Sequence, residues 1–141
     1  MSESPRSRGR EMVLQALYAL ECGDRVPGDD LFNMEADDLP PPRAVDYARK
    51  LFDLVRANRD DVDKQIERLA TNWDLDRIAA IDRNILRLAI VELDHMVDVP
   101  IKVVLNEAIE LAKKFSTVES SAFVNGILDK YAKEMENARR T

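Results

Sequence analysis

Three arginines stand at alternate positions near the N-terminus, in the stretch SPRSRGR. The guanidinium groups of Arg6, Arg8 and Arg10 carry permanent positive charge and can donate paired hydrogen bonds to phosphate groups. Glu3 is the only acidic residue among the first ten. Two interpretations remain open from these residues alone: a solvated chain terminus, or an arginine-rich arm that becomes ordered on binding RNA.

A second basic cluster is predicted from Arg83, Arg87 and Lys102. Arg83 and Arg87 stand four residues apart in an apolar stretch, so on a helix their side chains share one face. We expect their guanidinium groups to reach solvent together where that helix meets water. Lys102 follows Pro100 at the start of the next predicted helix and could extend the cluster.

The stretch AFVNG, residues 122–126, places an aromatic residue near a glycine in a predicted helix. At about 100° per residue, Phe123 lies at the edge of the apolar stripe, while Asn125 and Gly126 lie outside it. The bare backbone at Gly126 is explained either by a neighbouring helix that packs there or by another flat group that comes close. Spacing alone favours the packed helix.

Catalytic and metal-binding motifs are absent from the sequence. It contains no glycine-rich phosphate loop, HExxH, CxxC or Gly-x-Ser-x-Gly motif. The single His95 and the single Cys22 have no recognisable partners, which excludes a histidine-rich metal site and an internal disulfide. Carboxylates are abundant, and we interpret them as solvated helix faces. We therefore expect a protein that is not an enzyme.

Charge and hydropathy indicate a cytoplasmic protein. The formal net charge of −6 argues against a protein that coats nucleic acid indiscriminately, so any contact with an anion should be local. No stretch has the length and apolar character of a membrane span, and MSESPRSRGR lacks the apolar core of a secretory signal. We expect no membrane association.

Apolar residues recur at intervals of three and four, which predicts helices and no strands. Residues 75–96 form either one long buried helix or a short one followed by a long one, with Asp82 available as the second N-terminal cap. A capping box from Ser116 to Glu119 is expected to open the last helix. The expected helices cover residues 7–22, 43–58, 59–70, 75–96, 101–115 and a final segment from 116 onward.

The fold class predicted from these segments is all-α, with six or seven helices in two packed helical bundles. Residues 1–141 form one domain, with an N-terminal helical subdomain of about residues 1–72 and a C-terminal one of about 73–141. The boundary falls in TNWDLD, where Trp73 is large enough to wedge between two layers. An acidic, irregular connection is expected over residues 23–42.

Three blocks of the sequence resemble the NusB family of bacterial transcription antitermination factors. The blocks are RGREMVLQALYALE, NWDLDRIAAIDRNILRLAIVEL and DVPIKVVLNEAIELAKKFSTVESSAFVNGILDK, and they cover about half of the chain in the family's order. The resemblance implies two small helical bundles and no cofactor. It also implies partners: NusE, a small-subunit ribosomal protein, the boxA element of ribosomal RNA transcripts, and RNA polymerase with other Nus factors.

The resemblance also implies which residues contact RNA. Arg6, Arg8 and Arg10 match the family's arginine-rich lead-in, and Phe123 matches the aromatic residue of FVNG that resembles its RNA-stacking residue. Ala122 stands where the family often has lysine, so RNA affinity is expected to depend more on NusE and the arginines. The complete set of predicted RNA-binding residues is Arg6, Arg8, Arg10, Tyr18, Arg83, Arg87, Lys102, Phe123 and Asn125.

Two alternatives accompany the antitermination hypothesis. Some relatives form homodimers that cover the RNA-binding face, and no residue in this sequence decides whether this chain does. A domain of this family is also fused to ribosomal RNA methyltransferases, but only eleven residues follow Lys130, so we expect no catalytic half.

Overall fold

The computed structural model describes residues 4–23, 41–71 and 74–140. These residues form six α-helices and one short 3-10 helix, and no strand occurs among them, which confirms the all-α prediction. The elements are α1 (Pro5–Glu21), α2 (Pro42–Ala57), α3 (Arg59–Leu69), η3 (Leu75–Arg77), α4 (Ala80–His95), α5 (Ile101–Phe115) and α6 (Val118–Arg140).

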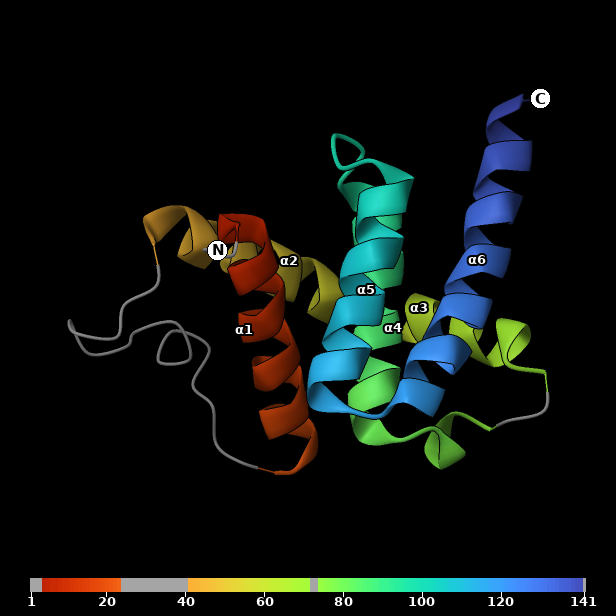
Figure 1. Cartoon of the computed structure of the whole chain (residues 1–141), viewed down its shortest axis with the longest axis horizontal. Helices are drawn as coiled ribbons and strands as arrows, with labels where there is room; N and C mark the ends of the chain where they lie inside the picture. Colours follow the sequence, from red (N-terminus) through yellow and green to blue (C-terminus); the bar gives the residue numbers. More distant parts are fainter. Residues whose placement is uncertain (1–3, 24–40, 72–73, 141) are drawn as a thin grey trace.

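The helices gather around α4 (Figure 1). Helices α1 and α2 pack against each other and against α4 on one side, while α5 and α6 form a second closely packed pair that also contacts α4. Helix α3 packs on α4 and α6. The predicted boundary near residue 72, the Trp73 wedge and most of the acidic connection lie outside the described residues.

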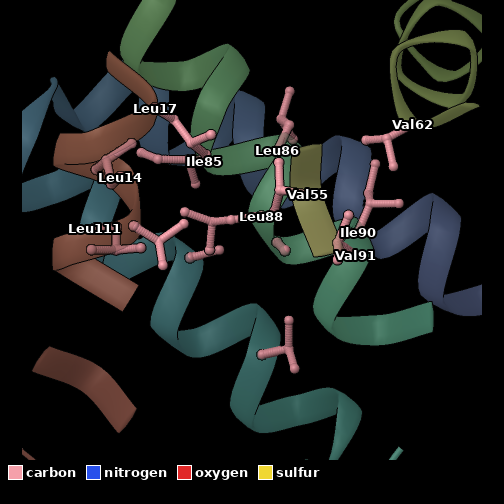
Figure 2. Packing of buried hydrophobic residues seen from close by; sticks show 14 of the residues in the cluster. Leu14, Leu17, Val55, Val62, Ile85, Leu86, Leu88, Ile90, Val91 and Leu111 are labelled. Carbon is pink, nitrogen blue, oxygen red and sulfur yellow. The ribbon is translucent and has the colours of Figure 1, made fainter. Parts of the chain in front are cut away.

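One continuous apolar core joins the two groups of helices, and α4 supplies its centre. Figure 2 shows Leu14 and Leu17 of α1 beside Ile85 and Leu88 of α4, all within this cluster. Ile85 and Ile90 of α4 are completely buried, and further buried side chains lie around most of the circumference of this helix. The prediction of a central, buried helix in this stretch is confirmed, and burial of this kind is the main stabilising term of such a fold.

The crossing of α1 over α2 depends on a glycine. Gly9 is buried, and a Cβ atom added there would lie 3.0 Å from the carbonyl oxygen of Ala44 and 3.3 Å from the ring of Tyr47. Without a side chain, the two helix backbones approach closely. Gly9 is therefore a packing residue within the arginine-rich stretch.

Two predicted helix starts differ from the structure. The short helix before α4 is η3, but α4 begins after Ala79, and Asp82 lies in its first turn with its side chain bonded to Ser120. At the start of α6, Thr117 rather than Ser116 accepts the capping hydrogen bond, since its Oγ1 lies 3.0 Å from the backbone nitrogen of Ser120. Both differences arise where the first turns of α4 and α6 meet.

None of the helices in the described part of the chain combines the length and the apolar character that crossing a membrane requires.

Candidate nucleic-acid interface

The predicted RNA-binding residues lie at two ends of the helical bundle. Helices α1 and α4 run antiparallel, because Arg10 bonds to Glu92 near one end and Glu21 bonds to Arg83 near the other. Arg6 therefore lies at the end where α5 begins, and Tyr18 lies about 18 Å further along α1, given a rise of 1.5 Å per residue. Figure 1 shows α6 beginning at the second end, close to the start of α4.

Arg6 and Arg8 lie in the first turns of α1 rather than in a separate arm. Arg6 is exposed, donates a 2.9 Å hydrogen bond to Asp98 and stacks over the ring of Tyr47 at 5.2 Å. The hydrogen bond from Arg6 holds the pKa of Asp98 below its ordinary value. Arg8 is half-buried and donates a hydrogen bond of 3.2 Å to Glu11.

Arg10 is enclosed in the protein, with 2% of its surface exposed. Its guanidinium group donates two hydrogen bonds of 2.7 Å to the buried carboxylate of Glu92, and the hydroxyl of Tyr47 donates a third to the same carboxylate at 2.8 Å. Burial opposes the positive charge, but the bonded Glu92 outweighs it and raises the pKa of Arg10. The structure thus gives Arg10 a role in joining α1, α2 and α4.

Arg83 and Arg87 lie together, but the prediction that they emerge into solvent is wrong. Arg87 is buried and bonds to Asp63 of α3 at 2.7 Å and to Asn84 at 2.9 Å. Arg83 donates hydrogen bonds to Glu21 of α1 and to the carbonyl oxygens of Leu75 and Ile78. The two arginines are neutralised because carboxylates from other helices converge on them.

Glu21 is the shared acceptor at this junction. Burial alone would raise the pKa of its carboxyl group, but hydrogen bonds from Arg83 and Asn84, together with the charges of Arg83 and Arg87, lower it overall. Glu21 therefore stays ionised and fixes the end of α1 to the start of α4.

Three further predicted residues are exposed. Lys102 lies in the first turn of α5 and makes no hydrogen bond or ion pair with any other residue that the structure describes. Tyr18 is 41% exposed, and a hydrogen bond with the side chain of Cys22 raises its pKa. Asn125 is exposed on α6. Lys102 lies at the opposite end of the bundle from the other two.

Phe123 lies between two surface hollows. The first has a volume of about 270 Å³ and the second about 240 Å³. The first hollow is lined by Arg77, Ile78, Ala79, Asp82, Glu119, Ser120 and Phe123. The second is lined by Leu69, Ala70, Thr71, Ala122, Phe123, Gly126, Ile127 and Lys130. We call these two hollows and the ring between them the Phe123 surface.

The backbone at Gly126 is open. A Cβ atom added there would meet nothing within 4 Å beyond its own helix, so no neighbouring helix packs against it among the described residues. The packing interpretation, which spacing alone favours, is therefore wrong. The open edge beside Phe123 leaves room for another flat group.

Two cations flank Phe123 that the sequence did not indicate. Arg77 of η3 lines the first hollow and is highly exposed. Its Nε atom lies 4.0 Å from Oδ2 of Asp74, which is also highly exposed. Lys130 lines the second hollow and has no hydrogen-bond or ion-pair partner in the described part of the chain. Lys130 could have been found from its position seven residues after Phe123, which places both on one helix face. Arg77 follows no such periodicity.

The described part of the chain has no group of three or more His, Cys, Asp or Glu side chains that could hold a metal ion. An exposed edge with an aromatic ring between two cations suits contact with a base and its neighbouring phosphates. The fold and this surface define the class as an all-helical protein that carries an aromatic ring and two cations along one edge.

The chain belongs to the NusB family, whose profile matches residues 7–133. Among its relatives, the transcription antitermination protein NusB of Myxococcus xanthus is 48% identical over 90% of this chain and 94% of its own length. The protein of the same name from Anaeromyxobacter dehalogenans is 49% identical over 97% of this chain and 96% of its own.

Solved structures agree with this assignment. NusB of T. maritima superposes with a TM-score of 0.82 at 37% identity, over 94% of each chain. The NusB chain in a crystal structure of antitermination factors NusB and NusE in complex with dsRNA superposes with a TM-score of 0.81 at 26% identity, covering 92% of this chain and 97% of that one. The resemblance drawn from the sequence is confirmed. The relatives' names describe antitermination and no catalytic activity, in agreement with the expected absence of enzyme function.

Proposed function

We propose that this chain is an antitermination factor that binds boxA-type RNA of ribosomal RNA transcripts together with NusE. In this role it promotes processive transcription by RNA polymerase in company with other Nus factors. Membership of the NusB family supports the role, and the solved complex of NusB, NusE and dsRNA supports the two partners.

The observation that carries the RNA-binding proposal is the Phe123 surface. Phe123 offers a ring at the edge of an open helix face, with Arg77 on one side and Lys130 on the other. A base stacked on an aromatic ring contributes about 1–3 kcal/mol to binding of single strands, and basic side chains pair with the phosphates before and after it.

The six predicted cations divide into two roles in this proposal. Arg6, Arg8 and Lys102 supply further phosphate contacts at the far end of the bundle. Arg10, Arg83 and Arg87 act indirectly, because their guanidinium groups are bonded within the protein and hold the helices that carry the surface.

Ala122 lines the same hollow as Lys130. This hollow lacks the lysine that the family often has before its aromatic residue, but Lys130 still gives it one positive charge. Affinity should accordingly depend on Lys130 and Arg77 as well as on NusE.

The test measures binding of boxA-type RNA in the presence of NusE for Phe123→Ala and Phe123→Leu. We expect Phe123→Ala to lose about 1–3 kcal/mol of binding free energy. Phe123→Leu keeps an apolar side chain for packing but lacks a flat face, so it should lose a similar amount. Wild-type affinity in a folded Phe123→Leu variant would contradict stacking and leave Phe123 as a packing residue.

A further inference from the structure

A basic hollow of about 550 Å³ lies where α1 and α2 begin, at the opposite end of the bundle from the Phe123 surface. Its charged and aromatic lining consists of Arg6 from α1 and Arg43, Asp46, Tyr47 and Lys50 from α2. Figure 1 shows the two helices beginning close together. Three cations thus face one carboxylate among the described residues of the lining, although the whole chain carries a net charge of −6. This local excess of positive charge suits an anionic partner, and we call the site the α1–α2 hollow.

Two of its cations are unpaired. The side chains of Arg43 and Lys50 are exposed, and neither makes a hydrogen bond or ion pair with another residue that the structure describes. They stand seven residues apart on α2, so they share one face of the helix. The first turns of α1 and α2 contain no acidic residue that would offset these charges.

Arg6, the third cation, is held by contacts that a ligand can replace. Its guanidinium group lies over the ring of Tyr47 and donates a 2.9 Å hydrogen bond to Asp98. The side chains of Arg6 and Asp98 are 47% and 66% exposed, and ion pairs as exposed as this are weak. The pKa of Asp98 is lowered first by the hydrogen bond from Arg6 and also by the charge of Lys50, so both cations lie near this carboxylate.

We propose that the α1–α2 hollow is a second RNA site, in which Arg6, Arg43 and Lys50 bind phosphates of a strand that also crosses the Phe123 surface. Asp98 competes with these phosphates for Arg6. The inference rests on the proposed RNA-binding function. Phosphate contacts carry no sequence information, so this site adds affinity without adding sequence preference.

The distance between the two ends of the bundle sets the length of RNA that can reach both sites. Arg6 and Tyr18 lie about 18 Å apart along α1, which a stacked strand spans with about five nucleotides at about 3.4 Å each. A short RNA bound at the Phe123 surface therefore leaves the α1–α2 hollow empty, whereas a longer RNA occupies both.

The first test is the length dependence of RNA binding, measured by fluorescence anisotropy with NusE present. A boxA-type RNA of about six nucleotides is compared with the same RNA extended by about eight uridines on its 5′ or its 3′ side. One of the two extensions should raise the affinity about three- to tenfold at about 0.1 M salt. It should also steepen the slope of log K against log salt by about 1.4–2.1, the value for two or three phosphate contacts. Equal affinity of the short RNA and both extended RNAs would overturn the proposal.

The double variant Arg43→Ala, Lys50→Ala tests which residues provide this gain. It should bind the short RNA like wild type, but the extra salt slope of the extended RNA should fall by about 1.4. Arg56→Ala, Lys64→Ala is the matched control, because it removes one arginine and one lysine from exposed positions on α2 and α3. The control should keep the whole gain, and a wild-type gain in the first variant would overturn the site.

Asp98→Asn tests the competition in the opposite direction. It keeps the shape of the side chain but removes its charge, so Arg6 becomes available to phosphate. We expect the extended RNA to bind about two- to fivefold more tightly than to wild type, with no change for the short RNA. Asp60→Asn, the control, removes the same charge from an exposed position in the first turn of α3 and should leave the ratio of the two affinities intact. A wild-type ratio in Asp98→Asn would overturn the competing role of Asp98.

The outcomes separate this inference from the proposed function. If the wild-type protein with NusE binds neither the short nor the extended RNA, the proposed function itself is contradicted. If the short RNA binds and extension adds nothing, only the second site is overturned. Binding of NusE without RNA is measured for each variant; a loss in Arg43→Ala, Lys50→Ala would assign the hollow to the protein partner and overturn its role as an RNA site.

Discussion

Arg10 and Glu92 form an ion pair with 2% and 0% of their side chains exposed. Removing one partner of such a pair leaves a buried charge without compensation, which costs about 3–5 kcal/mol in comparable cases. We predict that Glu92→Gln lowers the free energy of unfolding by about 3 kcal/mol, measured by urea denaturation at neutral pH. RNA affinity, referred to the folded fraction, should change little.

Arg68 and Glu134 provide the matched control. They form an ion pair at the same 2.7 Å, but each side chain is about half exposed. Exposed ion pairs contribute about 0–1 kcal/mol to the free energy of unfolding, so Glu134→Gln should change that free energy only slightly. If Glu92→Gln and Glu134→Gln lowered the free energy of unfolding equally, burial of the Arg10–Glu92 pair would have no effect on stability, which would contradict this prediction.

Glu21 makes stability depend on pH. The pKa of Glu21 is lowered in the folded protein from the ordinary value of 4.5. Its contribution to the free energy of unfolding is therefore fully present above pH 4.5 and is lost as the pH falls through the folded pKa. We predict that Glu21→Gln is less stable than wild type at pH 7 and that the difference shrinks at acidic pH, in parallel urea titrations. A difference that stays constant into the acid range would contradict this role.

The types of these residues were visible in the sequence, but their partners were not. Arg10 was predicted to bind RNA as part of an arginine-rich arm, and Arg83 and Arg87 as a pair that reaches solvent from one helix face. The acceptors Glu92, Glu21 and Asp63 come from other helices, and no local pattern connects them to the arginines. Only the packing of α1, α3 and α4 decides which guanidinium groups remain free.

Two helical glycines differ in what surrounds them. Gly126 faces open space, while a Cβ atom at Gly9 would lie 3.0 Å from the backbone oxygen of Ala44. Replacing either by alanine brings the same gain in helix propensity, about 1 kcal/mol. We predict that Gly126→Ala stabilises the protein by about that amount, whereas Gly9→Ala is net destabilising because α1 and α2 must move apart.

Thermal denaturation of the two glycine variants measures this difference. The melting temperature should rise for Gly126→Ala and fall for Gly9→Ala. A rise in both would mean that the crossing of α1 and α2 adjusts without cost.

Helix periods were read from the sequence more reliably than helix ends. The apolar spacing placed every described helix to within a few residues, because each buries one face against α4 or a neighbour. The caps were less accurate. Asp82 looks like a cap by type, but its carboxylate bonds to Ser120 across the helix junction, a contact made only in the folded protein.

At the scale of the whole molecule, the Phe123 surface is assembled from segments that are distant in sequence. The end of α3, η3 with the start of α4, and α6 each supply part of its lining. The resemblance indicated Phe123, and the helical wheel located the open edge beside it. Arg77 could not be predicted as part of this surface, because its place beside Phe123 depends on how α4 and α6 begin side by side.

The central claim is that RNA crosses this surface between Arg77 and Lys130. Its most direct test is the salt dependence of boxA-type RNA binding, with NusE present, for the double variant Arg77→Ala, Lys130→Ala. Each phosphate contact with a single strand contributes about 0.7 to the slope of log K against log salt. The control is Arg56→Ala, Lys64→Ala, which removes the same charge from exposed positions on α2 and α3. We predict that the slope falls by about 1.4 in the first variant and stays unchanged in the control; a wild-type slope in the first variant would contradict the claim.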